Sequence, residues 1–147
     1  MEKTKVMVYF NIKGDDFPLE TVTELLGITP TKTMKKGELR TPEHPPYRFT
    51  SWSYGTDYEE TLDVDNQLLP VLKAFKGKVD VINDIQSTYD TQCSIVIVPE
   101  IYDGRSPGFV FKKDTIEFIY RINASIDIDL YAMPYVDDNP EVEYGFD

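Results

Sequence analysis

Several residue types are scarce in this chain, and each scarcity excludes a class of protein. The 147 residues include one cysteine and one histidine, Cys93 and His44. One cysteine cannot form an internal disulfide, and the two residues are too few for a zinc cluster of the usual spacing. No window approaches about 18 consecutive apolar residues, so we expect no membrane-spanning helix. Residues 1–5 lead straight into a strand-like segment without the features of a secretion signal, so we expect a cytoplasmic protein.

Positive charge is also scarce. There are 15 Lys and Arg residues against 26 Asp and Glu residues, which gives a formal net charge of −11. Nucleic-acid binding gains most of its affinity from Lys and Arg, and anionic membranes attract the same residues, so we expect neither partner. A basic protein partner would instead be attracted. The simpler explanation is that the negative charge keeps a small protein in solution.

The charge is unevenly distributed along the chain. Residues 29–48 contain five basic residues and two acidic ones, whereas residues 123–147 contain seven acidic residues and no Lys or Arg. Two interpretations remain open at this stage. The two regions attract each other, or the acidic region is a docking surface for another molecule.

The apolar residues predict one α+β domain. Hydrophobic residues make up 41% of the chain, which is enough for a core, and the length suits a single domain. Their spacing predicts strands at residues 5–13, 47–54, 91–102 and 125–134, and helices at residues 19–26, 62–75, 79–89 and 112–122. Pro70 falls inside the second helix, so we expect either a kink or a regular helix that starts near Leu69. The proline-containing segment 29–47 is expected to be a long, mostly irregular loop.

This order of elements predicts two layers, a mostly antiparallel sheet with helices on one face. Residues 10–28 and 97–126 both read as strand, helix, strand, so a ferredoxin-like arrangement of two similar halves is compatible with the sequence. We expect residues 1–136 to form the domain and residues 137–147 to form an acidic C-terminal tail.

The segment 125–134 has the clearest alternation in the chain and is predicted to be a half-buried strand. Ile126, Ile128 and Leu130 would share one face, and Asp127, Asp129 and Tyr131 the other. Two carboxylates on one side could contribute to a Mg²⁺ or Ca²⁺ site, but a solvated polar face is the simpler interpretation, so we predict no metal site.

No constellation of catalytic residues is visible. His44 stands in a proline-rich segment with no orienting partner, and Cys93 stands in an apolar strand that favours a buried, inert thiol. The chain has neither a glycine-rich nucleotide-binding motif nor the Gly-x-Ser-x-Gly motif of hydrolases. We therefore expect neither an enzyme nor a cofactor.

Trp52 and Tyr54 lie two residues apart and would share one face of a strand. Core packing is the first interpretation for Trp52. The alternative is an aromatic platform in a groove that faces the basic loop, where Lys35, Lys36 and Arg40 would attract a small anionic ligand.

Five short segments, taken in order, resemble a bacterial family known as domain of unknown function 4279. They are residues 10–17 (FNIKGDDF), 26–32 (LGITPTK), 36–37 (KG), 50–54 (TSWSY) and 126–131 (IDIDLY). Two positions depart from the expected pattern, because Met34 replaces an aromatic residue and Pro70 interrupts a helix. The resemblance implies a small stand-alone protein of bacteria or phages and carries no activity. Some small acidic proteins of this kind act as immunity or anti-defence factors, which is an analogy of class.

The expected function is therefore binding. The leading hypothesis is a non-catalytic protein that neutralises or regulates another protein, of the immunity or phage counter-defence type, through an acidic face. The alternative is a small-ligand module that uses the Trp52 region and the basic loop. The candidate binding residues are Trp52, Tyr54, Lys35, Lys36, Arg40, Asp127, Asp129 and Tyr131.

Overall fold

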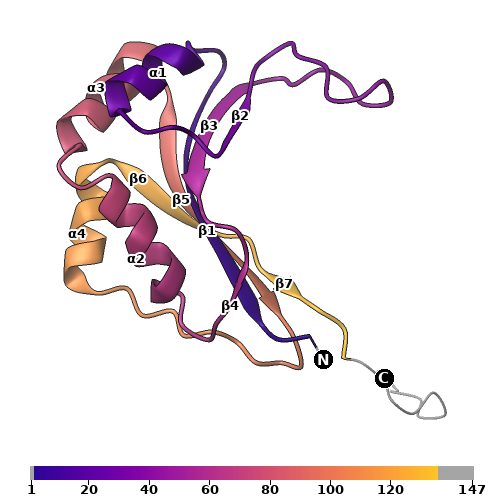
Figure 1. Cartoon of the computed structure of the whole chain (residues 1–147). Helices are drawn as coiled ribbons and strands as arrows, with labels where there is room; N and C mark the ends of the chain where they lie inside the picture. Colours follow the sequence, from indigo (N-terminus) through magenta and orange to yellow (C-terminus); the bar gives the residue numbers. More distant parts are fainter. Residues whose placement is uncertain (1, 136–147) are drawn as a thin grey trace.

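The computed structural model describes residues 2–135, so the expected tail, residues 137–147, lies outside the described part. Residues 2–135 form an α+β fold with four helices and one seven-stranded, mostly antiparallel sheet. The strands are β1 (Lys5–Gly14), β2 (Lys32–Met34), β3 (Thr50–Gly55), β4 (Glu59–Glu60), β5 (Gln92–Ile101), β6 (Ala124–Ile128) and β7 (Tyr131–Ala132). The helices are α1 (Leu19–Leu26), α2 (Asp65–Ala74), α3 (Val79–Tyr89) and α4 (Lys113–Arg121). Figure 1 shows all four helices on one side of the sheet and none on the other.

The strand order is β2-β3-β1-β5-β6, with β4 pairing with β1 and β7 pairing with β5. Strand β1 is antiparallel to both β3 and β5, whereas β5 and β6 are parallel. Both strand–helix–strand units, β1–α1–β2 and β5–α4–β6, join parallel strands. They differ because β3 lies between β1 and β2, whereas β5 and β6 are direct neighbours. The order β2-β3-β1-β5 contains a split strand–helix–strand unit, so the ferredoxin-like arrangement, which the sequence left open, stays a prediction.

Strand β1 is the centre of the core on its helix side. Val6, Val8, Phe10 and Ile12 alternate along the strand, and each is fully buried. The Phe10 ring packs against Phe75 of the α2–α3 connection with a centroid distance of 4.3 Å. The mostly apolar segment 5–13 is thus buried on one face only. The alternate side chains, such as Met7, Tyr9 and Asn11, are half-buried on the side that no helix covers.

Helices α1 and α3 have the predicted bounds. The first ends at Gly27, whose φ of 67° is the left-handed conformation that glycine adopts without strain. Helix α2 starts at Asp65 and continues through Pro70, so its regular part does not begin near Leu69. Burial of Leu68, Val71 and Leu72 on the same helix stabilises it, which offsets the hydrogen bond that proline cannot donate.

Two predicted segments differ from the structure at the sheet edges, and one strand lies outside the predicted elements. The loop 29–47 contains the short strand β2, which pairs with β3. Strand β4, which pairs with β1, lies between the predicted strand 47–54 and the predicted helix 62–75. The predicted strand 125–134 is divided into β6 and β7, and its apolar side chains are 37–48% exposed rather than buried. The reason is its position, since β6 is the last strand in the sheet order and has a neighbour on one side only.

Candidate functional site

The sheet has one face that no helix covers (Figure 1). The strand registers place its side chains in rows across the sheet. One row is entirely polar, and from one edge to the other it consists of Lys32, Ser53, Asn11, Ser94 and Ser125. The next row contains Gly55, Tyr9, Val96 and Asp127. Polar side chains in the middle of a sheet indicate a face that has not been selected to pack under helices.

A groove of about 640 Å³ lies on this face over β1, β2 and β3. The Asn11 side chain forms part of its floor, where its amide nitrogen donates hydrogen bonds to Ser51 Oγ at 2.7 Å and Ser53 Oγ at 2.8 Å. Met7, Tyr9 and Lys32 also line the groove. It therefore combines apolar surface, hydroxyl groups, the Lys32 ammonium group and the Asp57 carboxylate, a mixture found in small-ligand sites.

The other half of the same face is acidic. Asp127 lies in the row of Tyr9, and Asp129 follows with the same orientation, because its backbone N–H also points to β5 and donates to the carbonyl oxygen of Ile97 at 2.9 Å. The Tyr131 hydroxyl donates to Asp129 Oδ2 at 3.1 Å. The structure therefore brings Asp127, Asp129 and Tyr131 together on one exposed surface, which we call the acidic face.

The carboxylates of the acidic face raise the pKa of two nearby tyrosines. Burial raises the pKa of Tyr9 first, and the negative charges of Asp129 and Asp127 raise it further. The pKa of Tyr131 is raised mainly by its hydrogen bond to Asp129. Both phenols consequently stay protonated at neutral pH, and the Tyr131 hydroxyl uses its proton in the hydrogen bond to Asp129.

The other predicted aromatic residues lie on the opposite side of the sheet. Trp52 is fully buried, its ring meets Phe10 and Phe75 edge-on at 6.3 Å, and its Nε1 donates to Thr23 Oγ1 at 3.0 Å. Tyr54 is half-buried against the Phe75 ring. Neither ring faces the groove, so the aromatic platform considered from the sequence is corrected to core packing for Trp52.

The predicted basic residues are largely engaged within the protein. Lys35 Nζ donates to Asp16 Oδ1 at 2.6 Å, and Lys36 Nζ donates to Asp15 at 2.9 Å. The hydrogen bond from Lys35 is the main reason why the pKa of Asp16 lies below its usual value, and Thr50 contributes a second hydrogen bond. The Arg40 guanidinium lies 5.3 Å from the centroid of the Tyr47 ring. These cations therefore hold the 35–49 loop instead of converging on one ligand.

The surroundings of His44 and Cys93, the two residues considered for catalysis, do not suit a catalytic role. His44 is exposed on the loop and its Nδ1 lies 2.6 Å from Thr41 Oγ1. Cys93 is buried on the helix side, and burial raises the pKa of its thiol to about 12, which keeps it protonated. Within residues 2–135 there is no group of three His, Cys, Asp or Glu side chains that could hold a metal ion. No helix in this range is long and apolar enough to cross a bilayer.

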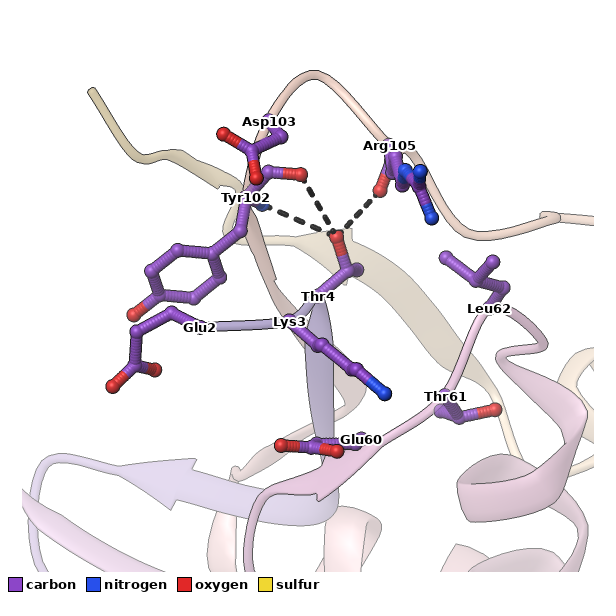
Figure 2. Close-up of a pocket in the computed structure, with 9 residues that line it drawn as sticks. All are labelled: Glu2, Lys3, Thr4, Glu60, Thr61, Leu62, Tyr102, Asp103 and Arg105. Carbon is purple, nitrogen blue, oxygen red and sulfur yellow. Dashed lines mark hydrogen bonds between the residues drawn. The ribbon is translucent and has the colours of Figure 1, made fainter. Parts of the chain in front are cut away.

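A second hollow, of about 310 Å³, lies where the N-terminal segment meets the turn after β5. Figure 2 shows the Thr4 hydroxyl under this turn, where it accepts from the Tyr102 N–H at 3.1 Å and donates to the Arg105 carbonyl at 2.6 Å. Thr4 is almost fully buried and its hydroxyl is thus used to hold the turn. The charged residues around it have both signs, as Glu2, Lys3, Asp103 and Arg105 show, so the hollow selects no obvious ligand.

Sequence reasoning missed the groove residues Asn11, Ser51 and Ser53. A signal was present, because each occupies an alternate position of a strand whose other side chains are buried, as Trp52 is between the two serines. The alternation assigns them to one face. It does not say that this face lacks a covering layer, and for that reason Asn11 is half-buried while Ser51 and Ser53, at 4% and 8% exposure, lie at the floor of the groove.

Comparison with known proteins adds the family. The model of the family described as domain of unknown function (DUF4279) matches residues 2–133, which is nearly all of the described part. The chain therefore belongs to the DUF4279 family, as the five short sequence segments suggested. Neither the curated proteins nor the solved structures gave a significant match.

Proposed function

We propose that this chain is a non-catalytic binding protein that neutralises or regulates a basic protein partner through its acidic face. The observation that carries the proposal is the position of Asp127, Asp129 and Tyr131 on the side of the sheet that no helix covers. A protein partner can reach this side without any rearrangement of the core, and a basic surface would be steered to it by charge. An immunity or phage counter-defence role is one form that such neutralisation would take.

Substitution of the two carboxylates tests this proposal. We expect Asp127→Asn with Asp129→Asn to abolish salt-sensitive capture of a basic protein from a bacterial extract. The matched control is Asp80→Asn with Asp84→Asn, which removes the same charge from exposed positions on α3. A captured set that is identical for the wild-type chain and the Asp127/Asp129 variant would overturn the proposal, since the acidic face would then not select the partner.

The groove over β1, β2 and β3 supports a second candidate, the binding of a small anionic ligand. Lys32 lines the groove and forms no ion pair among residues 2–135, and the serine hydroxyls beside it can donate to an anion. With ATP and citrate as probes, binding should raise the melting temperature and change the emission of Trp52, whose strand carries Ser51 and Ser53. The variant Lys32→Met should lose this response. No response of the wild-type chain to either probe would count against this candidate.

A further inference from the structure

We infer that the outer edge of β6 is a docking strand, and that an extended segment of the partner pairs with it as an additional strand of the sheet. This segment would carry Lys or Arg side chains on one face and aliphatic side chains on the other. The inference rests on the proposed function and specifies how the partner is held.

The first support is the free edge. β6 is the last strand in the sheet order, and no strand within residues 2–135 pairs with its outer side. The Asp129 N–H donates inward to β5, and the N–H and C=O groups of successive residues in a strand point to opposite sides. The backbone groups of Ile126 and Ile128 therefore point outward, in the spacing that an added strand needs.

The second support is the weak protection of this edge. Edge strands are commonly protected by charged side chains, especially lysine, or by proline, a bulge or very short length. β6 is five residues long, its one charged residue is Asp127, it contains no proline, and its Ile126 and Ile128 side chains are 37% and 42% exposed. The opposite edge differs, because β2 is three residues long and includes Lys32. One edge is thus protected and the other is suited to pairing.

The third support is charge, which indicates the kind of segment that pairs with β6. Ile126 and Ile128 lie on the helix side of β6, while Asp127 and Asp129 lie on the uncovered side. A second copy of β6 paired with this edge would bring its own carboxylates next to Asp127 and Asp129, and like charges on neighbouring strands are destabilising. A strand with basic side chains on that side and aliphatic ones on the other is complementary to both faces.

The test uses a capped heptapeptide of alternating valine and lysine, with binding measured by calorimetry. Two further peptides carry backbone N-methyl groups, one on the lysines and one on the valines. A peptide that lies in one direction along β6, with its lysines on the uncovered side, pairs through one edge only. For such a fixed direction we expect one methylated isomer to bind about as well as the parent and the other to bind at least about tenfold more weakly. Equal affinity of the two isomers, whether both bind like the parent peptide or both fail to bind, would overturn the docking strand. Failure of the parent peptide to bind at low salt would also overturn it.

Protein variants separate this inference from the proposed function. Ile126→Pro should abolish peptide binding, because proline removes an outward N–H that the sheet does not use, whereas Ile126→Thr retains the N–H and should bind. If the Asp127/Asp129 variant loses binding but the two methylated isomers bind equally, the results support binding by the acidic face and contradict the docking strand. If the isomers differ but the Asp127/Asp129 variant binds normally, the results support strand pairing and contradict selection of the partner by the acidic face.

Discussion

The two faces of the sheet differ although the same strands build both. On the helix side of β1, Val6, Val8, Phe10 and Ile12 are fully buried, whereas Met7, Tyr9 and Asn11 on the other side are half-buried. The helix side supplies the apolar contacts that stabilise the fold. The uncovered side has a polar row, a groove and an acidic end, and no helix covers it (Figure 1). The stabilising core and the proposed binding surface thus lie on opposite faces, so substitutions on the two faces should have different consequences.

The largest difference in stability is expected between neighbouring residues of β3. Trp52→Ala should reduce the free energy of unfolding by about 3–5 kcal/mol, because it leaves a cavity beside the packed rings of Phe10 and Phe75. Ser53→Ala, on the opposite face, should cost less than about 1 kcal/mol, since Asn11 keeps its hydrogen bond to Ser51. Urea unfolding followed by circular dichroism measures both. Equal losses would contradict the assignment of stability to the helix side.

An intermediate effect is expected for the hydrogen bonds under the groove. Asn11→Ala removes both bonds to the serines, and we expect a loss of about 1 kcal/mol, because the freed hydroxyls remain within reach of water. The same urea experiment applies, with Ile12→Ala on the helix side as the comparison. A loss at Asn11 as large as that at Ile12 would show that the polar row is a structural core and not an accessible surface.

A smaller effect is expected from the Lys35–Asp16 pair that holds the loop. The pKa of Asp16 is lowered, so the pair contributes stability above the ordinary aspartate pKa and loses it as the pH falls through the lowered value. Lys35→Met should raise the Asp16 pKa toward its usual value, which a carboxyl-carbon NMR titration measures. The control Lys32→Met should leave it unchanged, because Lys32 does not pair with Asp16. An Asp16 titration unaffected by Lys35→Met would contradict the pairing.

The smallest effect concerns Tyr9. Its raised pKa means that the contribution of the neutral phenol to stability is complete below the ordinary tyrosine pKa and is lost as the pH rises through the raised value. Asp127→Asn with Asp129→Asn should lower the Tyr9 pKa, but not to its usual value, since burial remains the larger cause. A carbon-13 titration of the tyrosine rings measures this. The Asp80/Asp84 control should not move Tyr9, and an equal change in both variants would show a general effect of net charge.

The sequence predicted the elements whose own side chains determine them. Helices α1 and α3 have the expected bounds because their apolar residues recur with helical spacing. Strands β2 and β4 were missed because they are three and two residues long and depend on pairing with β3 and β1. The parallel pairing of β5 with β6 was also beyond local patterns, since it depends on where α4 packs.

The candidate site was predicted only in its acidic half. The alternation in residues 126–131 correctly assigned Asp127, Asp129 and Tyr131 to one side of the chain. Trp52 was attributed both to the core and to a platform, and a sequence cannot separate these uses because each needs a large aromatic ring. The accessibility of Asn11 depends on the absence of a second covering layer, which no single strand encodes.

The most direct test of binding by the uncovered side is an amide NMR map of the chain during titration with its partner or, until one is known, with the valine–lysine peptide. We expect the largest shift changes in residues 124–132 and at Tyr9, and little change in α1, α2 and α3. Changes concentrated on the helices, with residues 124–132 unaffected, would contradict the assignment of recognition to this side of the sheet.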